Sequence, residues 1–203
     1  MLAPRLIAIT DTTRADPDTL VGRFARLCAA AQPGSVMLQL RDPGLPVRER
    51  QALGERLVAL AHASEQLFCV NDRLDLALLL DADGVHLGEH SVEPADARRL
   101  VDSGMWISRA RHGAAEAEAR GADAIVLSPV MAARKGNPPL GAHGLEQARR
   151  FAGGPPPLLY ALGGVDAGNA AECLRAGADG VAAVGAALAD DPLPLLEALG
   201  IRS

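Results

Sequence analysis

Polar and charged side chains follow several short apolar runs of the sequence, where buried strands would end. Gln39 and Arg41 end one run at alternate spacing, so both side chains would point to the same side of a strand. An arginine directed into an apolar interior is unfavourable unless a carboxylate or an anionic ligand meets it. Asn71 and Asp72 follow the next run, and Asp72 has an alternative role as the N-cap of a helix over residues 73–80. We predict that these four residues bind an anionic substrate.

Two turns that contain glycine have the composition of a phosphate site. Gly163 and Gly164 follow one apolar run, and paired glycines let backbone N–H groups approach a ligand closely. Val184 and Gly185 end another run, and Gly185 is expected to open the last helix, whose N-terminus would attract an anion. The alternative is that these glycines only form turns. We predict phosphate binding by Gly163, Gly164, Val184 and Gly185.

His86 and His112 are the candidates for general acid–base catalysis, because an imidazole titrates near neutral pH. The alternative for His86, inside an apolar run, is a buried structural histidine, and the alternative for His112 is a helix cap or a solvated side chain. Arg109 follows the same run as His112, and Lys135 is the single lysine of the chain. We predict that both cations contact the substrate.

The elements that position these residues are eight short apolar runs. The runs are continuous rather than alternating, which is typical of strands buried on both faces. Longer stretches with helical spacing, at 48–63, 169–176 and 193–199, lie between or after them, and this alternation predicts a parallel sheet with right-handed crossovers. The predicted strands are 6–10, 36–40, 67–70, 85–87, 105–108, 124–127, 158–162 and 181–184.

An Ala-Asp pair recurs before three of these strands, at 82–83, 122–123 and 178–179. Repeated turns of one design suit a closed (β/α)8 barrel, and an open doubly wound sheet is the alternative with the same local alternation. We predict an α/β fold, a single small (β/α)8 TIM barrel that spans residues 1–203. In such a barrel the carboxyl ends of all strands meet at one mouth, which would bring the candidate residues together.

The composition excludes several classes of protein. A chain of 203 residues with 49% hydrophobic and 22% charged residues is long enough for one domain without disulfide or metal support. Its net charge of −5 and its 2% of aromatic residues argue against a nucleic-acid partner. No apolar run reaches the roughly 20 residues of a membrane span. The three cysteines are widely spaced and the start lacks a leader pattern, so we expect a reduced, cytoplasmic protein that does not bind membranes.

With these features in place, the chain resembles the thiamine phosphate synthase/TenI family nearly from end to end. The resemblance implies a small (β/α)8 barrel that forms a homodimer. The synthase of this family couples a pyrimidine pyrophosphate to a thiazole phosphate, with magnesium and cationic groups on the leaving pyrophosphate. The similar segments are QLRD at 39–42, VND at 70–72, ADGVHLG at 82–88, LSPV at 127–130, PLG at 139–141, ALGG at 161–164 and ADGVA at 178–182.

This chain matches the family pattern at some positions of the site and departs from it at others. The family pattern is matched at Gln39, Arg41, Asn71 and Asp72, and Asp72 would be one magnesium ligand in a synthase. The glycines of the phosphate site also match, and Lys135 matches a lysine of the sixth loop. The departures are Pro43 in place of a lysine, Ser91 in place of the second metal aspartate, Ala110 (or Ser108) at a serine position, and Ala132 and Ala133 at threonine positions.

These departures favour the TenI branch, which includes thiazole tautomerases. We therefore expect a protein that binds a small thiazole phosphate without a cofactor and isomerises it by proton transfer. The family's tautomerase histidine falls on Pro129, which leaves His86, His112 or Asp72 for that step. One alternative is a working thiamine phosphate synthase that uses Mg²⁺ at Asp72. The other is a non-catalytic regulator that binds thiazole phosphate.

Overall fold

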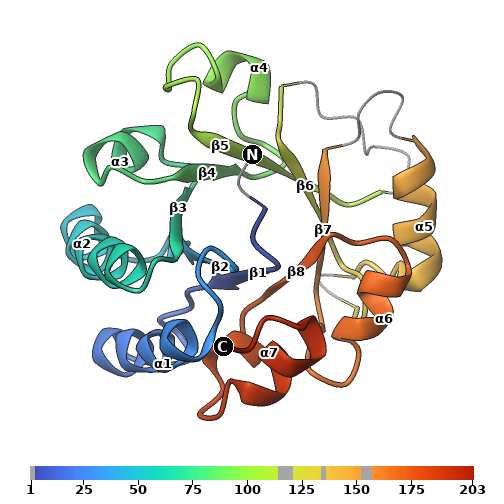
Figure 1. Cartoon of the computed structure of the whole chain (residues 1–203). Helices are drawn as coiled ribbons and strands as arrows, with labels where there is room; N and C mark the ends of the chain where they lie inside the picture. Colours follow the sequence, from blue (N-terminus) through green and yellow to red (C-terminus); the bar gives the residue numbers. More distant parts are fainter. Residues whose placement is uncertain (1–2, 114–120, 134–135, 152–156) are drawn as a thin grey trace.

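Eight parallel strands close into a barrel with helices on its outside (Figure 1). The computed structural model describes residues 3–113, 121–133, 136–151 and 157–203. Each strand pairs with its neighbours in sequence, and β1 closes the barrel by pairing with β8. The strands are β1 (Leu6–Ile9), β2 (Val36–Leu40), β3 (Leu67–Asn71), β4 (Gly84–Leu87), β5 (Trp106–Arg111), β6 (Ala124–Leu127), β7 (Leu158–Leu162) and β8 (Gly180–Ala183). The helices are α1 (Pro17–Ala30), α2 (Val47–Ala63), α3 (Leu74–Leu79), α4 (Pro94–Ala97), α5 (Gly141–Phe151), α6 (Ala170–Arg175), the 3-10 turn η2 (Ala186–Leu188) and α7 (Leu193–Leu199).

This architecture confirms the predicted closed barrel and excludes the open sheet. Each of the eight predicted strands is present, with ends that differ by a few residues. The largest difference is at β5, which continues to Arg111 because Ser108–Arg111 pair with Ala124–Leu127 of β6. The three predicted helices correspond to α2, α6 and α7.

The strands separate two apolar layers, because successive side chains of a strand point to opposite faces. In β1, Leu6 and Ala8 belong to the layer between the sheet and the helices, while Ile7 and Ile9 belong to the interior of the barrel. The continuous apolar runs in the sequence therefore reflect burial on both faces of the sheet.

Two aromatic side chains in the barrel interior explain why glycine begins two of the strands. Trp106 and Tyr160 meet edge to face, with ring centroids 6.1 Å apart. A Cβ on Gly84 would lie 2.8 Å from the Trp106 carbonyl oxygen and 3.1 Å from its ring. A Cβ on Gly180 would lie 2.7 Å from the Tyr160 ring. The missing side chains thus make room for the aromatic pair below the mouth of the barrel.

The repeated aspartates fix neighbouring strands to one another. Each lies directly before an even-numbered strand, and its carboxylate accepts the backbone N–H of a residue in the preceding strand. Its own N–H donates to the carbonyl of that same residue, and its carboxylate also binds a cationic or histidine side chain from an outer segment. The N–H donors are Phe68 to Asp83 at 2.9 Å, Ile107 to Asp123 at 2.8 Å and Leu159 to Asp179 at 2.7 Å, and the outer partners are His62, Arg98 and Arg149 respectively.

The structure excludes the alternative role of Asp72 and corrects the prediction for Gly185. Asp72 is not the N-cap of α3, because the capping position is Arg73 and no side chain caps the helix. Asp72 instead takes a left-handed backbone conformation with φ 62°, and its carboxylate turns toward the loop after β4. Gly185 does not open the last helix either. It precedes the three-residue turn η2, and α7 begins only at Leu193, so no long helix dipole points at Gly185.

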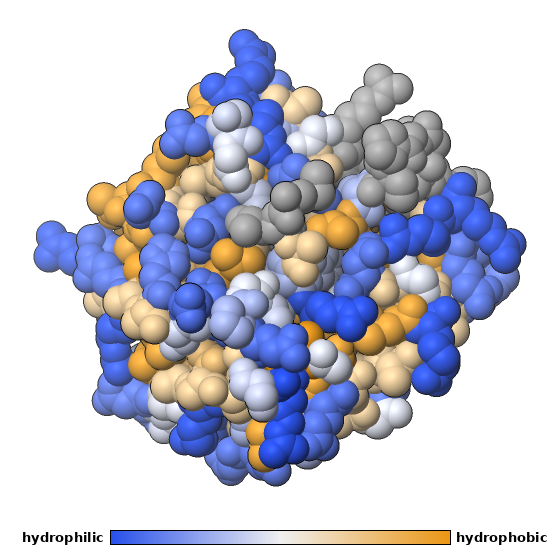
Figure 2. Space-filling view, in the orientation of Figure 1, coloured by the Kyte–Doolittle hydropathy of each residue, from blue (hydrophilic) through white to orange (hydrophobic). Residues whose placement is uncertain are grey.

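The surface in Figure 2 is mainly hydrophilic, with apolar colour on the side of the molecule that carries α3 and α4. The large apolar side chains exposed in this region include Leu78, Leu79 and Leu100. None of the helices in the described part of the chain is long and apolar enough to cross a membrane.

We call Asp83, Asp123 and Asp179, each with the strand residue and the outer side chain that it binds, the aspartate clasps. The clasp at Asp123 predicts an effect on stability. Replacing Asp123 with Ala leaves the Ile107 N–H without its acceptor and removes one of the two acceptors of the Arg98 guanidinium, so we expect the free energy of unfolding to fall by about 2–3 kcal/mol. Asp190→Ala is the control, because this side chain is 83% exposed and forms only surface ion pairs, so its change should stay below about 1 kcal/mol. Urea unfolding followed by circular dichroism measures both values. Equal losses in the two variants would contradict the role of the clasp.

Candidate active site

Two adjoining cavities open at the carboxyl ends of the strands, and Leu162 and Val184 line both of them. The first cavity, of about 450 Å³, lies over β2 to β6, and the second, of about 580 Å³, lies over β7, β8 and the loop after β1. This is the face on which (β/α)8 barrels carry their active sites. The arrangement offers two adjacent compartments for small ligands.

A chain of hydrogen-bonded polar side chains forms one wall of the first cavity. The buried Gln39 amide donates to Asn71 Oδ1 at 2.9 Å, and Asn71 Nδ2 donates to Asp72 Oδ2 at 2.6 Å. The other carboxylate oxygen of Asp72 accepts the Gly88 N–H at 2.7 Å. The chain fixes the orientation of both amides, because each has one end committed to a neighbour. The structure therefore brings together Gln39, Asn71 and Asp72, as predicted from their positions at the strand ends.

Arg41 adds positive charge to this cavity. Its backbone N–H donates to the Thr10 hydroxyl at 2.8 Å, which holds the chain where it leaves β2. Its guanidinium lines the cavity and has no partner among the residues that the structure describes. A half-buried guanidinium without a counter-ion favours an anionic ligand.

His86 is a neutral group at the floor of the first cavity. Its Nδ1 lies 2.8 Å from the Ser108 hydroxyl, and the side chain is almost fully buried. Burial lowers the pKa of His86 to about 4, Asp72 opposes this shift, and Arg41 and Arg109 reinforce it. At neutral pH the ring therefore offers a hydrogen bond to a ligand but not a charge.

His112 has a different environment at the edge of the same cavity. Its Nδ1 lies 2.7 Å from the Ser128 carbonyl oxygen, which can only accept, so Nδ1 carries the proton. Its Nε2 lies 3.4 Å from a carboxylate oxygen of Glu89, and both side chains are about 40% exposed. A histidine oriented in this way can take up a proton at Nε2 and return it.

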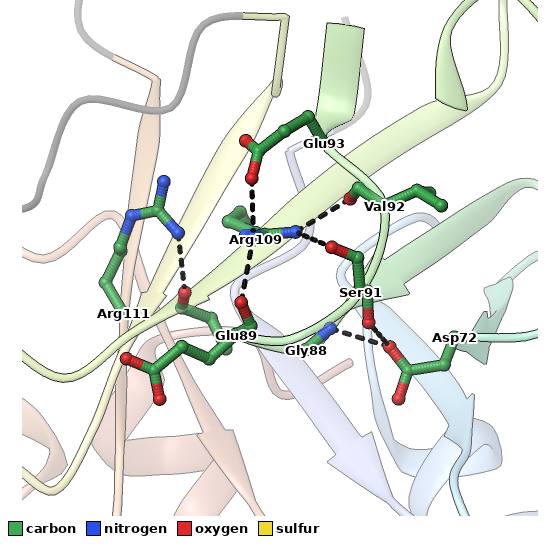
Figure 3. A network of polar contacts seen from close by, with 9 residues as sticks. Asp72, Gly88, Glu89, Ser91, Val92, Glu93, Arg109 and Arg111 are labelled. Atoms are coloured by element: carbon green, nitrogen blue, oxygen red, sulfur yellow. Dashed lines mark hydrogen bonds and ion pairs between the residues drawn. The ribbon is translucent and has the colours of Figure 1, made fainter. Parts of the chain in front are cut away.

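Arg109, which was predicted to contact the substrate, lines neither cavity. Its side chain is 2% exposed and runs outside the barrel to the loop after β4, where it donates to the carbonyl oxygens of Glu89, Ser91 and Val92 at 2.8–3.2 Å (Figure 3). It also pairs with Glu93 at 3.1 Å. The physical reason is strand alternation, because Ser108 and Ala110 occupy the inner face of β5 and direct Arg109 outward. Arg109 thus shapes the loop that contacts Asp72.

Asp72 meets only part of the requirement for a magnesium site. One carboxylate oxygen accepts two hydrogen bonds, from Gly88 N–H and the Ser91 hydroxyl (Figure 3). The other accepts one, from Asn71. One lone pair on the second oxygen thus remains for a cation. The described residues contain no group of three acidic, histidine or cysteine side chains that could hold a metal. Asp72 could therefore supply a single carboxylate ligand to a Mg²⁺ ion.

The second cavity contains the predicted phosphate residues Gly163, Gly164, Val184 and Gly185, which we call the glycine cradle. Gly163 and Gly164 have φ values of 102° and 72°, and a Cβ on Gly164 would overlap Ala132. The backbone N–H groups of Gly164 and Gly185 donate to no acceptor in the described part of the chain. Unpaired N–H groups on residues that line a cavity are available to bind an anion.

The structure also locates the positions at which the sequence departs from the family pattern. Pro43 and Ala110 line the first cavity, whereas Ser108 is buried beneath it against His86, so Ala110 is the residue at the substrate level. Ala132 and Ala133 line the second cavity. The predicted ligand Lys135 lies outside the described residues.

Arg14 is a further residue of the second cavity, which it lines together with Asp11, and strand-end patterns do not predict it. Arg14 belongs to no apolar run and comes four residues after Thr10, beyond the strand end at which candidates were sought. The signal that could have identified it is the polar Asp-Thr-Thr-Arg turn directly after the first strand.

Comparisons with known proteins agree with this geometry. The family model described as thiamine monophosphate synthase matches residues 6–187. A thiamine-phosphate synthase of Methanoculleus marisnigri is 37% identical over 85% of both chains, and one of Thermus thermophilus is 40% identical over 83% of this chain and 82% of its own. A solved thiamine phosphate pyrophosphorylase from Pyrococcus furiosus superposes with a TM-score of 0.80 at 29% identity, covering 98% of this chain and 96% of that one.

The low pKa of His86 predicts how stability depends on pH. The unfolded chain binds this proton near pH 6.5, whereas the folded protein binds it only near pH 4, so unfolding takes up a proton between these values. Stability therefore falls as the pH drops below about 6.5. Between pH 7 and pH 4.5 we expect the wild type to lose about 2 kcal/mol more free energy of unfolding than His86→Gln, as measured by urea unfolding at each pH. The same pH dependence in both proteins would show that the folded protein protonates His86 readily.

Proposed function

The chain belongs to the thiamine monophosphate synthase family, and from this premise we propose that it couples a pyrimidine pyrophosphate to a thiazole phosphate to form thiamine phosphate. The relatives described above are named for this reaction, and none of their names points to the tautomerase branch. They support the synthase better than the tautomerase that the departures at Pro43 and Ser91 led us to expect.

The observation that carries the proposal is the pair of adjoining cavities at one mouth. The glycine cradle offers unpaired N–H groups for the phosphate of the thiazole, and the first cavity offers Arg41 and the polar chain for the pyrimidine pyrophosphate. Leu162 and Val184, which line both cavities, would let the two rings meet across an apolar boundary. Holding two reactants side by side is itself a large part of such catalysis.

The reaction needs charge stabilisation more than proton transfer. The thiazole nitrogen forms a bond to the methylene carbon of the pyrimidine, and the carbon–oxygen bond to pyrophosphate breaks with its electron pair on the pyrophosphate. Arg41 would bind the departing pyrophosphate, while Asp72 would hold a magnesium ion. When bound, that ion neutralises further negative charge on the leaving group. A neutral His86 suits this step, because an uncharged floor does not add repulsion to a cationic pyrimidine.

Asp72→Asn tests this assignment. Asparagine tolerates the left-handed backbone of residue 72 and keeps its size, so the change removes the charge with little strain. We expect kcat/KM for thiamine phosphate formation to fall by about 100-fold. Product is measured from both substrates with saturating Mg²⁺. Asp75→Asn is the matched control, because Asp75 is exposed on α3 and pairs only with Arg73, and its activity should match the wild type.

The absence of thiamine phosphate from the wild-type reaction would refute the synthase proposal. An Asp72→Asn variant as active as Asp75→Asn would refute the role of Asp72 alone. Ser91→Asp is the converse variant, because it adds a second carboxylate beside Asp72, and it should lower the Mg²⁺ concentration for half-maximal rate. Tight binding of thiazole phosphate without turnover would instead favour the non-catalytic regulator.

A second candidate is isomerisation of a thiazole phosphate, favoured by the arrangement of His112. The Ser128 carbonyl fixes the tautomer of the ring, and Glu89 faces the nitrogen that would exchange the proton. The synthase reaction transfers no proton and therefore has no step for this pair.

His112→Gln separates the two candidates. We expect it to lower isomerisation of a carboxythiazole phosphate by about 100-fold or more, because the exchanging nitrogen is lost. Thiamine phosphate formation should stay within about threefold of the wild type. Both rates are measured on the same preparation. A large loss of synthase activity in His112→Gln would contradict this separation.

A further inference from the structure

Arg14 is the one cationic side chain among the described residues that line the second cavity. It lies on the loop between β1 and α1, next to Gly185 of the glycine cradle. Its Nη1 lies 3.5 Å from the point where a Cβ on Gly185 would stand, so the guanidinium faces the open side of that glycine. A side chain at position 185 would narrow this gap.

Asp11 holds the Arg14 guanidinium in this direction. Arg14 Nε donates to Asp11 Oδ2 at 3.1 Å, and the other oxygen of Asp11 accepts the Thr13 hydroxyl at 2.5 Å and the Thr13 N–H at 3.1 Å. Burial alone would raise the pKa of the Asp11 carboxyl, but the hydrogen bonds from Thr13 and Arg14 hold it below its ordinary value. The carboxylate is therefore ionised at neutral pH and binds Arg14 through Nε.

This arrangement leaves the two terminal nitrogens of Arg14 available. They have no acceptor among the described residues, and the side chain is 61% exposed. A guanidinium whose Nε is occupied still presents N–H groups that match the oxygens of a phosphate. Arg14 thus adds side-chain donors to the cavity that the unpaired N–H groups of Gly164 and Gly185 also line.

Arg14 is also the group that offsets negative charge in this cavity. Asp11 and Asp166 both line it, and a phosphate bound there without a cation would meet two carboxylates. Arg14 offsets one of these charges through its ion pair with Asp11 and lies next to Gly185.

We propose that Arg14 is a substrate-binding residue that completes the glycine cradle and selects the phosphorylated form of the thiazole, with Asp11 as the positioning residue that aims its guanidinium. The inference rests on the proposed function, because it takes the cradle as the place of the thiazole phosphate. Arg14 lies on the loop after β1 and is not among the residues that the family resemblance assigns to the site.

Calorimetric titration of the purified protein tests the proposal. We expect Arg14→Gln to raise the Kd for thiazole phosphate by about 30-fold, and Arg14→Lys to restore part of the affinity. Asp11→Asn should weaken binding by about fivefold, because the guanidinium loses its anchor. The Kd for the unphosphorylated thiazole alcohol should not change in any variant. In the synthase assay the KM for thiazole phosphate should rise with the Kd, while kcat stays within about threefold.

Arg26→Gln is the matched control, because it removes one exposed arginine from α1 outside both cavities and should leave the Kd unchanged. Equal affinity of Arg14→Gln and wild type for thiazole phosphate would overturn the inference and leave the proposed function intact. If the wild type does not bind thiazole phosphate, inorganic phosphate is titrated instead. If phosphate binding then depends on Arg14, the role of Arg14 as a phosphate ligand is supported although the proposed function fails. If inorganic phosphate does not bind either, both the inference and the proposed function are overturned.

Discussion

The register between neighbouring strands is the constraint on which the two cavities depend, and the aspartate clasps fix it at the opposite end of the barrel. Each clasp binds both backbone groups of one residue in the preceding strand, namely Phe68, Ile107 or Leu159. These three residues face the outer layer. Three positions further along, and therefore on the inner face, lie Asn71, Ala110 and Leu162, all of which line the first cavity. A shift of one residue at a clasp would turn these side chains away from the ligand.

Trp106 and Tyr160 fill the interior of the barrel between the clasps and the cavities. Gly84 and Gly180, which follow Asp83 and Asp179, leave room for these two rings. A chain so poor in aromatic residues places two of them here, where a large volume must be closed. Above this plug the side chains become polar, beginning with the buried pair His86 and Ser108. The site is therefore supported by a rigid apolar floor rather than by loops alone, which keeps the polar wall of Gln39, Asn71 and Asp72 in place.

Sequence reasoning identified the barrel and most of the first cavity, because both follow from strand periodicity. Gln39 and Arg41 were grouped correctly by their alternate spacing. The same rule, anchored at Ser108, would have excluded Arg109, which lies on the other face of β5. Gly185 was misjudged because a three-residue turn and a helix begin with the same residue types. Arg14 could not be found by reading strand ends, because its place at the second cavity depends on how the loop after β1 folds across to β8.

The way in which Arg109 holds the loop after β4 has a consequence for how this site can evolve. Three of its four partners are backbone carbonyl oxygens, which every amino acid possesses. The shape of the loop therefore does not depend on which side chains it carries. Residue 91, whose hydroxyl now binds Asp72, can be exchanged while the backbone around it keeps its course. A scaffold of this kind separates the inheritance of a loop's shape from the inheritance of its chemistry, because one substitution at residue 91 changes what faces Asp72 while the loop keeps its backbone.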